Sequence, residues 1–283
     1  MLLLNRTRNL LSHFKDPGQH KTLDASYIQV GSMYFKIQTT DPYFDHFIKR
    51  RYSTFSIAED AFPASGYYSF SFYPARQISG RPNFRDINFF GTHFYYRQHG
   101  ESNAYEVIIP KTYEDWQVNN FFKLFFASRC LHHDMILIHA SMIIRSGTAV
   151  LFIGQSGAGK STISNLSGYP VVHDDNVALT ITGDNKFLCR SIPFKEPYHK
   201  KSFEGSIDCI YRLFQSHTTF LKEVPLPQQY MYLLFSLWSF DGFENAATRE
   251  YNKQVAGYLQ RIHKMTCVKE LHFEKNKAFM ELI

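Results

Sequence analysis

The sequence has few cysteines and few charged residues, and each shortage argues against a class of protein. Only four cysteines stand among 283 residues, far apart and without a CxxC pair. This spacing predicts buried, reduced thiols in a cytoplasmic protein rather than a disulfide-stabilised secreted domain. Charged residues make up 20% of the chain, which is too few for a charge-rich disordered protein.

The usual signals of membrane insertion and nucleic-acid binding are also missing. No stretch reaches the roughly 18 apolar residues that a membrane-spanning helix needs. The amino-terminal sequence MLLLNRTRNLLSHFKD offers no secretory cleavage site. The net charge is only +6, and the densest basic segment is the short HKKS at 199–202. We therefore expect a soluble cytoplasmic protein that binds neither membrane nor nucleic acid.

Aromatic residues are abundant instead, with 27 Phe and 18 Tyr. Many lie before residue 112, in segments such as GYYSFSFYPA and NFFGTHFYYRQHG. Such segments favour strands, and their rings can form the core of a small sheet or a stacking surface for nucleobases. Because basic residues do not interleave with the aromatic stripe, the pattern favours a core.

The remaining patterns predict two domains: a smaller, aromatic-rich, β-dominated domain over 1–115 and an α/β domain over 116–283. We expect helices over 41–53 and 112–134, strands over 135–144 and 149–153, and a hairpin that turns at 183–185. From residue 204 onward the chain reads as mostly helical, and the expected helices are GSIDCIYRLFQS, PQQYMYLLFSLWSF and NAATREYNKQVAGYLQRIHKM. A last strand is expected in CVKELHF.

A glycine-rich segment, GQSGAGKST, follows the predicted strand TAVLFI. Its spacing matches the P-loop pattern, in which backbone N–H groups and the start of a helix surround phosphate oxygens. We expect Lys160 to contact the β- and γ-phosphates of ATP and Ser161 to bind Mg²⁺. The residues expected around the nucleotide are Gly154, Gln155, Ser156, Gly157, Ala158, Gly159, Lys160, Ser161 and Thr162.

Two adjacent carboxylates, Asp174 and Asp175, follow the apolar segment YPVV. One could hold Mg²⁺ and the other could take a proton from an attacking hydroxyl. A turn with two solvated Asp residues is the alternative. His139 stands among aliphatic residues in ILIHAS, and such a histidine is more often part of the core than of a site.

The order of these elements resembles the catalytic domain of the HPr kinase/phosphorylase family. That family carries a His 15 residues before the first P-loop glycine, a loop of the form G-x-S-G-x-G-K-S, and an Asp pair on the next strand. Here His139, GQSGAGKS and HDD stand in that order. The resemblance covers about residues 132–195 and implies a P-loop kinase core of the HPr-kinase/phosphoenolpyruvate-carboxykinase type, with a mixed sheet and flanking helices.

The resemblance also implies roles for individual residues. Asp175 would accept the proton of the substrate hydroxyl, His139 and Lys160 would lie near the phosphates, and Ser161 would bind Mg²⁺, with Asp174 as a second candidate ligand. The segment LCRSI lacks the metal-binding Glu that the family carries at a comparable position. Members of the family tend to assemble, so a homo-oligomer is also expected.

Three functions remain open at this stage. The first is an ATP-dependent kinase that transfers the γ-phosphoryl group to a hydroxyl of a protein, peptide or small molecule. In that reaction Arg190, Lys195 or Lys200 could stabilise the transition state. The second is a nucleotide-binding switch that only hydrolyses its nucleotide, and the third, less favoured, is a carboxykinase. The domain over 1–115 is the expected site of acceptor recognition.

Overall fold

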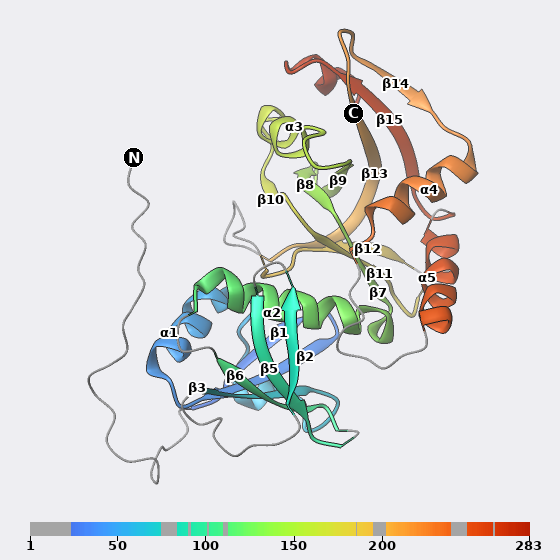
Figure 1. Cartoon of the computed structure of the whole chain (residues 1–283). Helices are drawn as coiled ribbons and strands as arrows, with labels where there is room; N and C mark the ends of the chain where they lie inside the picture. Colours follow the sequence, from blue (N-terminus) through green and yellow to red (C-terminus); the bar gives the residue numbers. More distant parts are fainter. Residues whose placement is uncertain are drawn as a thin grey trace, which may run out of the picture. The chain divides into compact units, whose positions relative to one another are not determined.

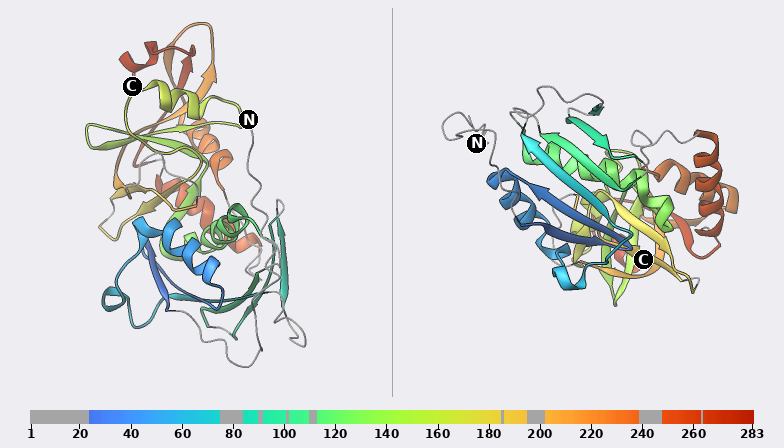
Figure 2. Two further views of the ribbon diagram at one scale, coloured as in Figure 1. Left: turned by 90° about the vertical axis from the view of Figure 1, so that its left-hand side faces the viewer. Right: turned by 90° about the horizontal axis from the view of Figure 1, so that it is seen from below.

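The computed structural model (Figures 1 and 2) describes residues 24–74, 84–89, 92–100, 102–109, 113–184, 186–194, 202–238, 248–262 and 264–283. The chain divides into two compact units, Met1–Lys123 and Leu124–Ile283. This division falls inside helix α2 (Asp115–Arg129), whereas the sequence places the boundary at its start. Each unit contains a mixed sheet, which confirms the α/β class. The two-domain assignment, with separate tasks, stays a prediction.

The first unit is built on a sheet with the strand order β1-β2-β3-β6-β5-β4. Its central strands β2, β3 and β6 are parallel, and the outer pairs are antiparallel. In β2, buried and half-buried residues alternate, so one face of the sheet is covered. The strands are β1 (Ser26–Val30), β2 (Met33–Thr39), β3 (Tyr68–Pro74), β4 (Arg85–Phe89), β5 (Thr92–Gln98) and β6 (Ala104–Ile109).

Helix α1 (Pro42–Arg51) lies where the sequence predicts a helix. Asp41 caps it, because its carboxylate accepts the backbone N–H groups of Tyr43 and Phe44 at 2.8 and 3.2 Å. Two short 3-10 helices follow, η1 (Ser53–Phe55) and η2 (Glu59–Ala61).

The aromatic residues of the first unit pack against one another in its core. The ring of Phe70 on β3 is stacked with that of Tyr105 on β6, with 5.3 Å between the centroids. Phe121 and Phe122 of α2 meet the Phe70 ring edge-on at 6.0 and 5.6 Å. All four side chains are buried. Among these residues the aromatic density therefore serves a core, as the sequence favours.

The second unit has a larger mixed sheet with the path β10-β8-β9-β13-β12-β11-β7, to which β15 and β14 are added beside β13. Strand β13 is parallel to both β9 and β15. The strands are β7 (Met135–Ile138), β8 (Ala140–Arg145), β9 (Thr148–Ile153), β10 (Val171–His173), β11 (Val177–Ile181), β12 (Phe187–Arg190), β13 (Glu204–Gln215), β14 (Phe220–Glu223) and β15 (Cys267–Phe273).

Two sequence predictions about the second unit are wrong. The segment GSIDCIYRLFQS is not a helix but most of strand β13. The spacing of its apolar residues fits a helix as well as a strand. It forms a strand because it pairs with β9 on one side and with β15 on the other. The single strand expected over 135–144 is two strands, because the chain leaves the ladder at His139.

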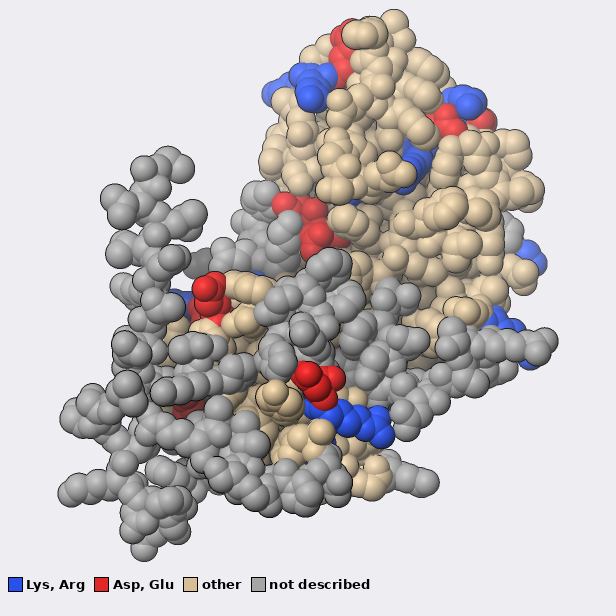
Figure 3. Space-filling model, viewed as in Figure 1, with Lys and Arg blue, Asp and Glu red and all other residues tan. Residues whose placement is uncertain are grey.

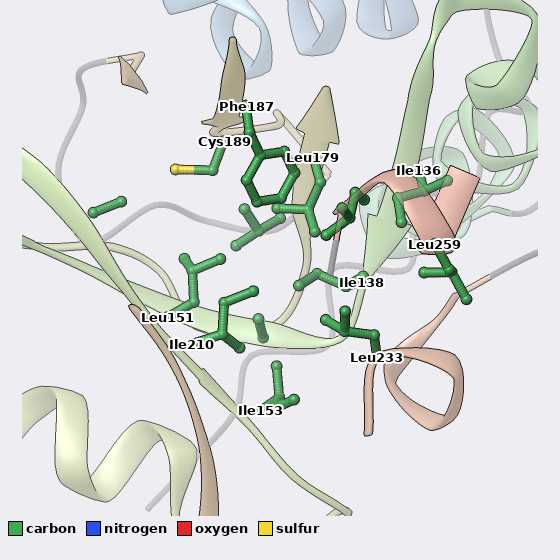
Figure 4. Packing of buried hydrophobic residues seen from close by; sticks show 14 of the residues in the cluster. Ile136, Ile138, Leu151, Ile153, Leu179, Phe187, Cys189, Ile210, Leu233 and Leu259 are labelled. Atoms are coloured by element: carbon green, nitrogen blue, oxygen red, sulfur yellow. The ribbon is translucent and has the colours of Figure 1, made fainter. Parts of the chain in front are cut away.

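Helices cover both faces of this sheet (Figure 1). On one face, α3 (Lys160–Leu166) contributes Ile163 to a core cluster with Phe152 and Leu213. On the other face, α4 (Leu226–Ser236) and α5 (Thr248–Ile262) contribute Leu233 and Leu259 to a second cluster (Figure 4). Both helices were predicted, as was α2. The unit also contains the 3-10 helices η4 (Cys130–His133) and η5 (Ala278–Glu281).

All four cysteines are free, and burial raises the pKa of Cys189 to about 12. None of the described helices has the length and apolar character needed to cross a bilayer. On the face shown in Figure 3, the Lys and Arg of the described residues are scattered among uncharged side chains.

Candidate functional site

The glycine-rich loop connects β9 to α3, as the sequence predicts. Gly157 and Gly159 have φ angles of +81° and +100°, a region that side chains rarely allow. A Cβ atom at Gly154 would lie 2.7 Å from the Cβ of Ala158, and one at Gly159 would lie 2.8 Å from Cζ of Phe273. The backbone therefore needs glycine at these positions to keep this conformation.

Lys160 is buried at the base of this loop. Its Nζ donates hydrogen bonds to the carbonyl oxygens of Gly154 at 2.8 Å and Gln155 at 3.2 Å. The ammonium group is thus held within the loop, where an anion would meet it. Gln155, Ser156 and Gly157 are exposed at the tip of the loop.

Ser161 and Thr162, which open α3, are also exposed, so the Ser161 hydroxyl is accessible to a metal ion. Gln215 of β13 supports the loop from the side, because its Nε2 donates to the carbonyl oxygen of Gly157 at 2.9 Å. Ala158, by contrast, turns back on the loop and donates its N–H to the Gln155 carbonyl at 3.1 Å.

His139 and Asp175 lie side by side. His139 Nε2 is 3.2 Å from Asp175 Oδ1, and both side chains are partly exposed. The position of His139 at the break between β7 and β8 explains this contact, because its side chain is released from the apolar core. Its backbone N–H donates to the carbonyl oxygen of Ser236 at the end of α4, at 2.7 Å.

The Asp pair follows β10 directly, at the end of that strand. Asp174 is 8% exposed, whereas the neighbouring Asp175 is more accessible and also accepts a hydrogen bond from the side-chain amide of Asn176. His173, the last residue of β10, holds the turn: its Nδ1 accepts the backbone N–H groups of Asp175 and Asn176 at 3.3 and 3.1 Å. His173 is buried, and the sequence motifs assign it no role.

One strand links this turn to the loop. Ala140 at the start of β8 donates its N–H to the carbonyl oxygen of Asp175 at 3.1 Å. The next residue, Ser141, donates its hydroxyl to the carbonyl oxygen of Lys160 at 3.3 Å and accepts one from the Ser164 hydroxyl at 2.7 Å. Ala140 and Ser141 therefore connect the Asp175 turn to the glycine-rich loop, although the two motifs are separate in the sequence. Ser141 and Ser164 were missed, because their role depends on pairings distant in sequence.

Of the three cations expected to stabilise the transition state, the structure describes only Arg190. Arg190 on β12 is engaged with Glu204, with 2.9 Å between Nη1 and Oε2. Lys195 and Lys200 lie outside the described residues. The structure therefore gives no support to any of the three.

The two side chains predicted to bind Mg²⁺, Ser161 and Asp174, would need phosphate oxygens as further ligands. The Ser161 hydroxyl and the Asp174 carboxylate are oxygen donors, which Mg²⁺ prefers over nitrogen and sulfur. The described residues contain no cluster of three or more His, Cys, Asp or Glu that could hold a metal ion on its own.

Comparison with known proteins does not assign the chain to a family. No family model matches the sequence, and no curated protein matches it. Among solved structures, the chain is similar to the Hpr(Ser) kinase/phosphatase from Coxiella burnetii, with 13% sequence identity and a TM-score of 0.23. The match covers 45% of this chain and 97% of that chain. A TM-score this low is not sufficient to assign a fold family or an activity.

Proposed function

We propose that the protein is an ATP-dependent kinase that transfers the γ-phosphoryl group to a hydroxyl of a protein, peptide or small-molecule acceptor. One observation carries this proposal: Ala140 and Ser141 bind the backbones of Asp175 and Lys160, respectively. A residue suited to remove a proton and a residue suited to bind phosphates are thus tied to the same strand. Such a pairing is what phosphoryl transfer to a hydroxyl requires.

In the proposed reaction, Asp175 accepts the proton of the acceptor hydroxyl while the acceptor oxygen forms a bond to the γ-phosphorus. The bond from the γ-phosphorus to the bridging oxygen breaks, and its electron pair leaves with ADP. Lys160 and the loop amides stabilise the charge on the phosphates. His139 orients the Asp175 carboxylate through the contact at 3.2 Å.

Mg²⁺, when bound, would neutralise part of the charge of the phosphates. Ser161 and Asp174 are the side chains that we propose to hold it, as oxygen donors that flank the loop and the Asp175 turn. We assign acceptor recognition to the domain over 1–115, and we propose a homo-oligomer as the working assembly.

The experiment is a transfer assay with γ-labelled ATP and the purified full chain, in the presence of cell extract or of a candidate hydroxyl acceptor. Label on an acceptor supports the kinase. Release of free phosphate without any labelled acceptor supports a nucleotide-hydrolysing switch instead. Failure of the protein to bind ATP with Mg²⁺, measured by calorimetry, would overturn both.

A further inference from the structure

Arg212 lies on β13 beside the loop, although no motif in the sequence marks it. In the parallel ladder of β13 and β9, Arg212 is paired with Ile153, the residue that precedes Gly154. Ile153 is paired in turn with Ala140 on β8. Neighbouring strands are about 4.8 Å apart, so the backbone of Arg212 is about 10 Å from that of Ala140, which binds Asp175. In α/β sheets, ligands bind at the carboxyl ends of such parallel strands.

The guanidinium of Arg212 is held in place by aromatic rings. Its Cζ lies 5.4 Å from the ring centre of Tyr232 on α4 and 5.8 Å from that of Phe214 on β13. The side chain is half-buried, its Nε is buried, and burial lowers the pKa of the guanidinium from its ordinary value. A fixed, partly desolvated cation of this kind is costly unless an acceptor compensates it.

Within the described ranges, the Arg212 guanidinium has neither a hydrogen-bond acceptor nor an ion-pair partner. The neighbouring carboxylate, Glu270, is paired with Arg212 in the ladder of β13 and β15 but is bound by other donors. These donors are Tyr232 at 2.6 Å, Gln228 at 2.8 Å, His272 at 2.9 Å and Lys222 at 3.1 Å. The Nη1 and Nη2 donors of Arg212 therefore remain available to a ligand, whereas its Nε is buried.

We propose that Arg212 binds an anionic group, a phosphate or a carboxylate, at the carboxyl ends of β9 and β13. A guanidinium bound on two rings offers a fixed pair of donors that matches such a group. This inference rests in part on the proposed function, which supplies two sources of the anion: the γ-phosphate of the nucleotide or an anionic group on the acceptor.

The test compares the full-length wild type with Arg212→Met, Arg212→Lys and Arg145→Met. Arg145 is a matched control, because it also lies on the sheet but at the last position of β8, opposite Thr148 at the start of β9, where its side chain pairs with Asp208 at 2.6 Å. Calorimetry measures the affinity of each protein for ATP, ADP and inorganic phosphate without an acceptor. Thermal denaturation measures the stability of each protein. We expect Arg212→Met to be at least as stable as the wild type without ligand, because it removes a desolvated charge.

If Arg212 binds the γ-phosphate, Arg212→Met loses the preference for ATP over ADP, by about tenfold to a hundredfold in the affinity ratio. If Arg212 binds an anionic group of the acceptor, Arg212→Met keeps the wild-type ratio of ATP to ADP affinity. It then loses the thermal stabilisation that inorganic phosphate gives to the wild type. Arg212→Lys should lose part of either effect, because a point charge replaces a fork of donors. If Arg212→Met does not fold, Arg212→Lys alone decides between these outcomes.

The inference is overturned if the ATP/ADP ratio and the response to phosphate are the same in the Arg212 variants as in the wild type and in Arg145→Met. It fails separately from the proposed function. If the wild type binds no nucleotide but binds inorganic phosphate through Arg212, the anion site stands and the kinase proposal does not. If ATP binds normally and no Arg212 variant changes any affinity, the kinase proposal stands alone.

Discussion

His139 Nε2 lies 3.2 Å from Asp175 Oδ1, at a point where two strands meet a turn. This contact brings together a histidine and a carboxylate that belong to separate parts of the sequence. In the proposed reaction His139 orients Asp175 or lies beside it at the acceptor, so substitutions in this pair test the reaction directly.

Asp175→Asn should abolish phosphoryl transfer and leave ATP affinity within a few-fold of the wild type, because the amide cannot accept the proton. Transfer and calorimetric binding are measured on the same preparation. Asp184→Asn is the control, since Asp184 is an exposed turn residue paired with Lys186. Full activity in Asp175→Asn would show that another group is the base.

Lys160→Ala should weaken ATP binding by at least about tenfold, because it removes the buried cation at the base of the loop. Lys186→Ala removes an exposed lysine on the same unit and should have no effect. An unchanged ATP affinity in Lys160→Ala would remove the loop from the mechanism.

Gly159→Ala should distort the loop, because the new Cβ would lie 2.8 Å from the Phe273 ring and the φ angle is +100°. Gly147→Ala is the matched control: its φ is +84°, but nothing lies within 4 Å of the added Cβ. Both variants should lose about 1 kcal/mol through the backbone, and Gly159→Ala should lose more in stability and in nucleotide affinity. Equal losses in the two variants would mean that the Phe273 contact does not matter.

His173→Asn should retain transfer activity, whereas His173→Phe should lose most of it. The Asn side-chain oxygen can replace Nδ1 as an acceptor for the backbone N–H groups two and three residues on, as in an Asx turn. Phenylalanine fills the space without an acceptor. A loss of kcat with little change in the KM for ATP would identify His173 as a positioning residue for the Asp175 turn. Equal activity of the two variants would contradict this role.

Glu270 makes stability depend on pH. Burial alone would raise the pKa of its carboxyl, but hydrogen bonds from Tyr232, His272 and Lys222 outweigh burial and lower the pKa below the ordinary 4.5. The unfolded chain therefore takes up this proton at higher pH than the folded chain. The stabilisation is present above pH 4.5 and is lost as the pH falls through the lowered pKa.

Glu270→Gln should accordingly cost about 1–3 kcal/mol near neutral pH, because the amide nitrogen cannot accept: either Tyr232 and Gln228 or Lys222 and His272 lose their acceptor. Its stability should fall less steeply than that of the wild type below pH 4.5. Glu223→Gln alters an exposed pair with Lys269 and serves as the control. Denaturant titrations at several pH values measure both effects, and parallel pH curves for the wild type and Glu270→Gln would rule out this linkage.

Local patterns were sufficient to predict the loop and most helices. The spacing of Gly154 and Lys160 is enough to predict the loop. Asp41 is a residue type that favours a helix start, and α1 begins directly after it. The α/β class is confirmed, whereas the kinase type of the core and the roles of the site residues stay proposals.

Long-range pairing accounts for what the sequence did not reveal. The local sequence around Arg212 predicts a helix. The segment is a strand because it pairs with partners distant in sequence, Ile153 and Glu270. The break at His139 has no local signal either, since aliphatic residues continue on both sides of it. Ser141 and His173 act through backbone groups that only the folded chain brings near.

The contact of Gly159 with Phe273 also has a consequence for synthesis. Phe273 belongs to β15, which pairs with β13 in parallel, and it follows Gly159 by 114 residues. On the ribosome, the glycine-rich turn is therefore made long before the ring that supports it. We expect the nascent chain to become competent for nucleotide only after β15 has emerged and joined the sheet.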